Sequence, residues 1–141
     1  MNQRPFKILG IEHVGVAVDS MEGLSEIFSD ILGLDCSCSE EVKDQQVITD
    51  IFEIGNSKLE FLKPTNPDSP IAQFVGKKGT GIHHIALLVD NLQAALDYVK
   101  GQGIQLIDES PRIGAEGLSI AFLHPKSTEG ILIEFCAKKN T

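Results

Sequence analysis

The sequence predicts an α+β fold made of two tandem βαβββ modules, whose strands would form one cupped eight-stranded mixed sheet with the helices outside. Two observations predict it. The segment 9–19 (LGIEHVGVAVD) recurs as 80–90 (TGIHHIALLVD), and each copy places a histidine at the start of an apolar run that ends on Val-Asp. A second repeated segment ends each half of the chain, as KLEFL at 58–62 and as LIEFC at 132–136. Repetition at about half the chain length indicates a duplicated module.

Changes in the spacing of apolar residues predict the strands and the helix of the first module. Residues 11–18 alternate as a strand rich in β-branched side chains. A helix is expected next, capped by Asp19 or Ser20 and ended by Gly33, with apolar residues at helical spacing between them. Three further strands are expected at 34–39, 47–54 and 58–62, with a loop at 40–46 and a turn at 55–57.

The second module repeats that order. A strand is expected over 82–89, followed by a helix that Asn91 caps and Gly101 ends. Three more strands are expected at 105–107, 118–123 and 131–135, separated by loops at 111–117 and 124–130. The chain is thus interpreted as a single domain, 8–137, with repeats at about 8–64 and 80–137 and a connector, 65–79, that contains a short helix at 70–75.

Composition excludes several classes of function. The chain has 141 residues, of which 42% are hydrophobic and 23% charged, as in a folded domain of ordinary size. A net charge of −8 disfavours a nucleic-acid partner, and no apolar run approaches the roughly 20 residues of a membrane helix. The N-terminus does not resemble a signal peptide, and three cysteines suit a reducing compartment, so a cytoplasmic location is expected.

Side-chain alternation predicts which face of each first strand is functional. His13 shares its face with Gly15, and His84 shares its face with Ala86, because alternate residues of a strand point the same way. A small neighbour beside each histidine leaves room for a ligand. His83 falls on the opposite face, so only His84 of this pair should point into the cup.

Two histidines and two glutamates recur at matched places, namely His13, Glu60, His84 and Glu134. A single strand histidine is more often a hydrogen-bonded core residue, and a single strand glutamate more often faces solvent. A glutamate between large apolar neighbours is costly to bury without a partner. The duplication favours one site of two imidazoles and two carboxylates, which suits Zn²⁺, Co²⁺, Ni²⁺ or Mn²⁺.

Five stretches resemble the vicinal oxygen chelate superfamily, which includes glyoxalase I, and within it the methylmalonyl-CoA epimerase family. They are IEHVGVAV (11–18), KLEFLKP (58–64), DSPIAQFV (68–75), GTGIHHIALLVDNL (79–92) and FLHPKSTEGILIEF (122–135). The last stretch discriminates best, because the HPKS turn is typical of the epimerases. The resemblance implies an acyl-CoA substrate whose C2 is inverted, a divalent metal held by the four residues named above, and a homodimer.

The resemblance also implies a pair of acid/base groups on opposite faces of the inverted carbon. One of them matches Glu134. For the other, an ungapped alignment places Thr49 where an acid is expected. Asp50 is adjacent, and a one-residue bulge would be needed to turn it inward. Asp50 is therefore the candidate second base.

Two other functions remain open on the sequence alone. A glyoxalase I-like lyase could use the same four ligands on a thiol hemithioacetal. A metal-free binding or resistance protein could instead hold a small molecule in the cup. In the HPKS turn, His124 and Lys126 are weaker candidates, and Lys126 is more simply read as a solvated turn residue than as a phosphate ligand.

Overall fold

The computed structural model describes residues 3–139, which divide into two compact units. The N-terminal unit is His13–His83. The C-terminal unit comprises the described residues from His84 onward together with those up to Glu12. The segment before His13 therefore belongs with the second repeat, although it precedes the first in sequence.

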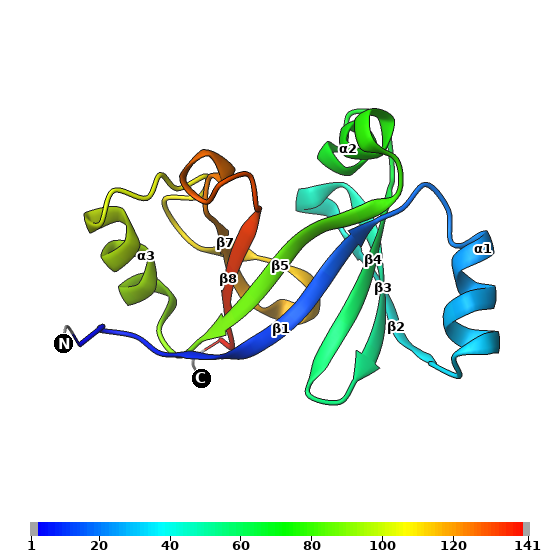
Figure 1. The fold of residues 1–141 in the computed structure, drawn as a ribbon, viewed down its shortest axis with the longest axis horizontal. Coiled ribbons are helices and arrows are strands. Elements are labelled where there is room, and N and C mark those ends of the chain that lie inside the picture. Colours follow the sequence, from blue (N-terminus) through cyan, green and yellow to red (C-terminus); the bar gives the residue numbers. More distant parts are fainter. Residues whose placement is uncertain (1–2, 140–141) are drawn as a thin grey trace. The chain divides into compact units, whose positions relative to one another are not determined.

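The N-terminal unit contains strands in the order β2-β3-β4-β1. Their bounds are β1 Ile8–Ala17, β2 Cys36–Val42, β3 Val47–Ile54 and β4 Ser57–Pro64, and β1 enters this unit at His13. β1 runs parallel to β4, while β2–β3 and β3–β4 are antiparallel (Figure 1). The tight Gly55 turn, with φ of 58°, joins β3 to β4 as the sequence predicts.

The helix after β1 differs from its prediction. It consists of α1 (Glu22–Ser25) and a π-helical segment, Glu26–Ile31. Its N-cap is Met21 rather than Asp19 or Ser20, and no side chain caps it. The helix covers one sheet face, where an apolar cluster forms around Val18, Phe52 and Phe61.

Aromatic contacts hold that helix to the sheet. The Phe28 ring lies 5.1 Å from the ring of Phe61, which meets Phe52 edge-on at 5.4 Å between centroids. Such pairs add to the stabilisation from burial itself. The predicted loop at 40–46 is also corrected, because β2 continues to Val42 and only Lys43–Gln45 forms a 3-10 turn.

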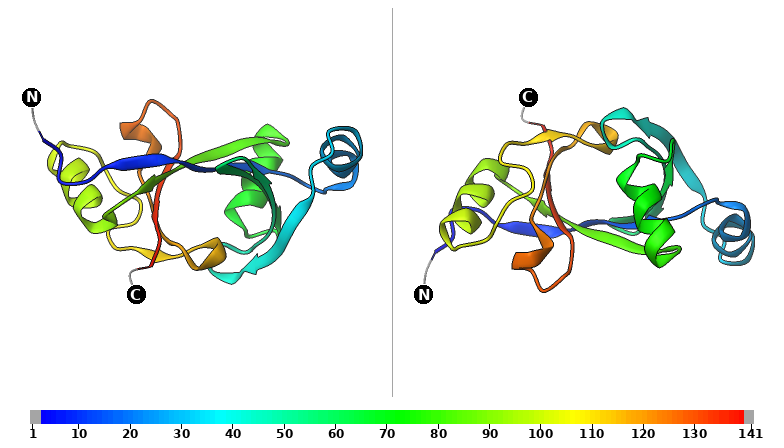
Figure 2. Two further views of the ribbon diagram at one scale, coloured as in Figure 1. Left: turned by 90° about the horizontal axis from the view of Figure 1, so that it is seen from below. Right: turned by 90° about the horizontal axis from the view of Figure 1, so that it is seen from above.

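The connector helix α2 spans Pro70–Lys78, longer than the predicted 70–75. The hydroxyl of Ser69 caps it by accepting a hydrogen bond from the Ile71 backbone N–H at 3.1 Å. Proline at the first helical position costs no hydrogen bond, since that N–H has no intrahelical acceptor. Figure 2 shows α2 close to the strands of its own unit.

The C-terminal unit contains strands in the order β5-β8-β7-β6. Its elements are β5 Gly81–Val89, α3 Leu92–Gly101, β6 Arg112–Ile113, β7 Ser119–Phe122 and β8 Ile133–Ala137, and β5 enters this unit at His84. β5 is parallel to β8, and the other pairs are antiparallel. α3 has the predicted bounds, and the Asn91 side chain caps it through the Ala94 N–H.

One strand of this unit lies elsewhere than predicted. Residues 105–107 form no named strand. Leu106 makes an isolated bridge to Leu123, just after β7, and the Ile107 backbone N–H donates to the Phe122 carbonyl at 2.9 Å. The short strand β6 lies instead in the predicted loop 111–117, which also contains a 3-10 turn, Ala115–Gly117. The order βαβββ is kept, so the two modules match as the repeat predicts.

The core of the C-terminal unit includes the segment that precedes the first repeat. Phe6 is 8% exposed and packs between Tyr98 of α3 and Phe135 of β8, with centroids 5.9 Å from each. The Lys7 backbone N–H donates to the Asp90 carboxylate at 2.7 Å.

Among the described residues, no helix is long and apolar enough to cross a membrane.

Candidate metal centre

The N-terminal unit buries one histidine against one glutamate. His13 Nδ1 lies 3.2 Å from Glu60 Oε2, and the two residues are 4% and 3% exposed. The register of β1 against β4 explains the contact, because Gly15 is the partner of Glu60 and His13 is two residues earlier on the same face.

The C-terminal unit contains an equivalent pair. His84 Nε2 lies 3.2 Å from Glu134 Oε1, and these residues are 4% and 3% exposed. Here Ala86 is the register partner of Glu134, two residues after the histidine. In each unit the glutamate therefore lies beside a small residue, Gly15 or Ala86, that comes two positions after the histidine. The repeat and the strand alternation predict this arrangement.

Each pair occupies the sheet face that its helix leaves uncovered. In the N-terminal unit, Phe61 points to α1 while its neighbour Glu60 points to the other face. In the C-terminal unit, Phe135 packs in the core beside α3 and Glu134 points the other way.

The chemistry of the four side chains fits a divalent ion. A carboxylate that is 3% exposed loses most of its hydration, which is costly unless a cation compensates. Imidazole nitrogen and carboxylate oxygen are ligands that Zn²⁺, Co²⁺, Ni²⁺ and Mn²⁺ accept. In each unit, the pair His13 and Glu60 or the pair His84 and Glu134 supplies one nitrogen and one oxygen ligand of this kind.

Asp50 lies away from this chemistry. β3 and β4 pair without a bulge from Val47 to Ile54, and Asp50 is the partner of Phe61. It therefore shares the helix-covered face and not the face of Glu60. Its carboxylate accepts the Ser39 hydroxyl at 2.7 Å and lies 3.1 Å from Lys63 Nζ. The inward turn that a second base requires is not made, because the register of β3 is regular.

Thr49 stands on the face of Glu60 instead. It pairs with Leu62, two residues beyond Glu60 on β4, and is 1% exposed. On β3 the position that alternation turns toward the histidine–glutamate pair therefore carries a hydroxyl and not a carboxylate.

Sequence reasoning missed a group of side chains next to the C-terminal pair. The Phe122 ring meets His84 edge-on, with centroids 5.4 Å apart. The Arg112 guanidinium stacks over the same ring, its Cζ 5.7 Å from the centroid. Asp108 holds both residues, since Oδ1 lies 3.2 Å from Arg112 Nε and Oδ2 accepts the Phe122 N–H at 2.8 Å. The arginine falls in a segment whose sequence predicts a loop, so no strand pattern points to it.

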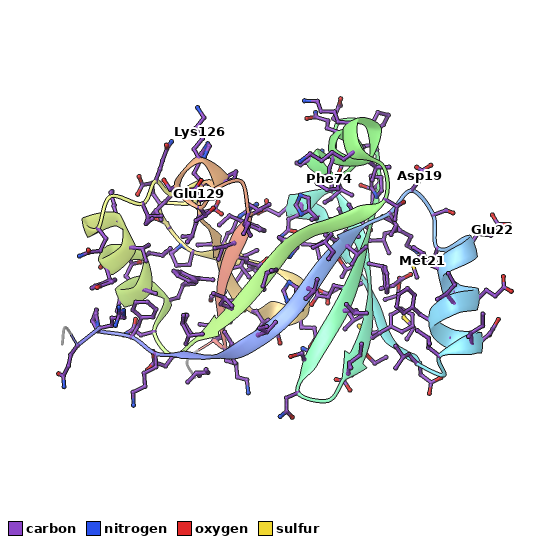
Figure 3. All side chains as sticks on the ribbon, viewed as in Figure 1. Asp19, Met21, Glu22, Phe74, Lys126 and Glu129 are labelled. Atoms are coloured by element: carbon purple, nitrogen blue, oxygen red, sulfur yellow. The ribbon has the colours of Figure 1, made fainter. Side chains whose placement is uncertain are left out.

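The HPKS turn has a structural explanation for its histidine. His124 Nδ1 accepts the Lys126 backbone N–H at 3.1 Å and so caps the 3-10 turn Pro125–Ser127. Figure 3 shows Lys126 and Glu129 projecting from the turn.

All three cysteines are free thiols, with Cys136 buried.

Comparison with known proteins agrees with this geometry. The profile of the glyoxalase/bleomycin resistance protein/dioxygenase superfamily matches residues 12–122. The chain belongs to this superfamily. It is 41% identical over 129 residues to the uncharacterized protein YqjC of Bacillus subtilis, covering 92% of both chains. It is also 37% identical over 130 residues to the mitochondrial methylmalonyl-CoA epimerase of Mus musculus, covering 92% of this chain and 73% of that protein.

A solved structure confirms the fold class of this superfamily member. Methylmalonyl-CoA epimerase in complex with methylmalonyl-CoA and NH4+ matches with a TM-score of 0.89 and 29% identity, covering 94% of this chain and 96% of that one. The predicted family resemblance is thus confirmed.

Proposed function

We propose that this chain is a metal-dependent epimerase that inverts C2 of methylmalonyl-CoA. The observation that carries the proposal is the pair of equivalent buried His–Glu contacts, one in each unit of a chain related to epimerases. The similarity to an epimerase solved with methylmalonyl-CoA supports an acyl-CoA substrate.

His13, Glu60, His84 and Glu134 would hold one divalent ion between them. When bound, the ion would supply Lewis-acid stabilisation of the negative charge that develops on the thioester oxygen. The histidines bring neutral nitrogen ligands, and the glutamates bring the charge that a divalent ion balances. The small neighbours Gly15 and Ala86 leave space beside these ligands for the substrate.

Proton transfer at C2 requires a base to remove a proton and an acid to return one to the opposite side. Glu134 is the first candidate for this work. We assign the second position to Glu60 rather than Asp50, because Asp50 lies on the helix-covered face and is engaged by Ser39 and Lys63. Each unit then contributes one glutamate with both roles, ligand and proton carrier.

The test is to incubate a single C2 epimer of methylmalonyl-CoA with the Co²⁺-loaded chain and to follow the appearance of the other epimer. We expect a mixture of both epimers at equilibrium. Methylglyoxal with glutathione is the parallel substrate. Turnover of methylglyoxal with glutathione, without epimerisation, would replace the proposal with a glyoxalase I-like lyase. A chain that takes up no Co²⁺ and turns over neither substrate would point to a binding protein.

A further inference from the structure

A threonine hydroxyl lies on the same sheet face as the His13–Glu60 pair. In the N-terminal unit, Thr49 of β3 is the partner of Leu62, which follows Glu60 by two residues on β4. Register partners lie side by side and alternate residues of a strand point the same way, so Thr49 and Leu62 share the face of Glu60. The hydroxyl of Thr49 therefore belongs to the face of the candidate ligands.

The surroundings of Thr49 on this face are apolar. Its neighbours on the same side of β3, Val47 and Ile51, are fully buried, and Leu62 is almost so. Thr49 itself is 1% exposed, close to the 3% of Glu60, so a ligand that reaches the glutamate lies near the threonine as well. A hydrogen bond in such apolar surroundings is electrostatically stronger than in water, and a polar group left there without a partner is costly.

No hydrogen bond to another residue in the described part of the chain engages the Thr49 hydroxyl. A hydroxyl has one O–H donor and two acceptor lone pairs. Most buried polar side chains in folded proteins have a partner, so a buried hydroxyl that lacks one indicates a position for a ligand. Valine has nearly the same shape and the same β-branched preference for strands, so the packing of β3 does not require the hydroxyl.

The proposed substrate offers two acceptors near its reacting carbon, the thioester oxygen and the free carboxylate. Hydrogen bonds to an ionised acceptor are shorter and about twice as strong as those between neutral groups. The carboxylate is therefore the better partner for a donor in apolar surroundings. Thr49 is also uncharged, so it adds no repulsion against an anionic group that binds beside Glu60.

We propose that the Thr49 hydroxyl donates a hydrogen bond to the free carboxylate of the malonyl thioester and thereby favours carboxylated acyl thioesters over simple ones. This inference rests on the proposed function. Because Thr49 and Glu60 share one face of the N-terminal unit, the bound carboxylate lies beside the residue assigned as the second proton carrier. Thr49 is a binding residue in this account, and the proton transfers at C2 remain with the glutamates.

The test compares the wild-type chain with Thr49→Val, which removes the hydroxyl, and Thr49→Ser, which keeps it, all loaded with Co²⁺. Methylmalonyl-CoA is measured by its KM for deuterium exchange at C2. Isobutyryl-CoA, which carries a methyl group in place of the carboxylate, is measured by its inhibition constant. For Thr49→Val we expect KM to rise about 10- to 100-fold, as for loss of a hydrogen bond to a charged group, with the isobutyryl-CoA constant unchanged. Thr49→Ser should keep most of the affinity.

Folding stability separates this binding role from a structural one. Because no described residue bonds to the hydroxyl, the denaturation midpoint of Thr49→Val should equal or exceed that of the wild type. Thr49→Ser loses a buried methyl group and should be less stable. Affinity and stability thus change in opposite senses in the two variants. Thr65→Val, at an exposed threonine of the same unit, is the control and should leave KM unchanged.

Every other result overturns the proposal. An equal loss of affinity for both thioesters in Thr49→Val assigns the hydroxyl to the part that they share. A fall in kcat at unchanged KM assigns it to the oxygen that gains charge during the reaction. A lower denaturation midpoint, or loss of the metal ion, in Thr49→Val gives the hydroxyl a structural role instead.

The inference and the proposed function can fail separately. A wild-type chain that exchanges C2 deuterium while Thr49→Val keeps its KM removes Thr49 from the site and leaves the epimerase intact. No exchange by the metal-loaded wild type overturns the proposed function and this inference together.

Discussion

Glu134 has two roles in the proposed reaction, as a metal ligand and as a proton carrier, and it is 3% exposed beside His84. Glu134→Gln keeps the shape of the side chain but removes its charge and basicity. Because positioned acid/base groups contribute about 10²–10⁴-fold to such reactions, we expect C2 exchange to fall by at least about 100-fold. Exchange rates and metal content are measured together.

The matched control is Glu129→Gln, in the exposed turn before β8, which should behave as the wild type. Equal exchange rates in Glu134→Gln and Glu129→Gln would remove Glu134 from the site.

Replacing Asp50 tests whether this residue, rather than Glu60, is the second base. Its carboxylate joins Ser39 and Lys63 on the helix-covered face, so its contribution is to stability. We expect Asp50→Asn to lower the free energy of unfolding by about 1–2 kcal/mol, because it weakens two contacts of a largely buried group. C2 exchange should stay within about threefold of the wild type, a difference below 1 kcal/mol in barrier.

Chemical denaturation and exchange kinetics measure both quantities, with Asp97→Asn, which alters an exposed contact to Gln93, as the control. A hundredfold loss of exchange with unchanged stability would restore Asp50 as the second base.

At the scale of elements, the short strand β6 depends on a close approach by Gly114. A Cβ at this position would lie 2.9 Å from both Cδ1 and Cγ2 of Ile120, which is 2% exposed. The backbone φ is not positive, so the requirement is for space. We expect Gly114→Ala to lower the free energy of unfolding by about 1–3 kcal/mol through overpacking.

Gly101→Ala is the matched control, because a Cβ there meets nothing within 4 Å at the end of α3. Thermal or denaturant unfolding compares the two variants. An equally stable Gly114→Ala protein would show that Ile120 moves aside without cost.

Strong periodicity predicts some elements to the residue. β3 occupies Val47–Ile54 and α3 occupies Leu92–Gly101, as expected from an unbroken period and, for α3, a capping asparagine. The strand expected at 105–107 is interrupted because two side chains accept backbone N–H groups that a regular ladder would use. Ser127 Oγ accepts the Gln105 N–H, and Asp108 accepts the Phe122 N–H.

The helix after β1 shows a second limit of local pattern. Apolar spacing predicts its extent, since α1 and the π-helical segment together span Glu22–Ile31. The pattern does not predict the π-helical backbone. It also fails to predict the cap, because Ser20 approaches only the Glu22 N–H, at 3.4 Å, and Met21 occupies the N-cap position.

At the scale of the whole chain, duplication predicts the candidate ligands and cannot predict what only one copy contains. A histidine and a glutamate recur at matched places of both repeats, as His13 and Glu60 and again as His84 and Glu134, so the sequence alone singles them out. Arg112 has no counterpart that the repeat could reveal. The choice of Glu60 over Asp50 as the second base also cannot be made from the sequence, because it depends on the regular register of β3, which the sequence leaves open.

One ion per chain is the stoichiometry that the two His–Glu pairs predict, since neither unit has more than one such pair among the strand residues described. Removing either histidine should weaken binding strongly, because three ligands hold a divalent ion less tightly than four. We expect His13→Ala and His84→Ala each to lose the ion on dialysis, measured by elemental analysis. Two ions per chain, or retention in both variants, would contradict a shared site.

The homodimer expected from the family resemblance stays a prediction. Light scattering of the metal-loaded chain measures it, and a mass of about twice 15.3 kDa would agree with it.

Deuterium wash-in at C2 of methylmalonyl-CoA in D₂O tests the central claim most directly. The chain is compared after loading with Co²⁺ and after treatment with a chelator. We predict rapid exchange by the loaded chain, its loss on chelation and its recovery when Co²⁺ or Zn²⁺ is restored. No exchange by a chain that holds one ion would contradict the claim that this protein is a metal-dependent methylmalonyl-CoA epimerase.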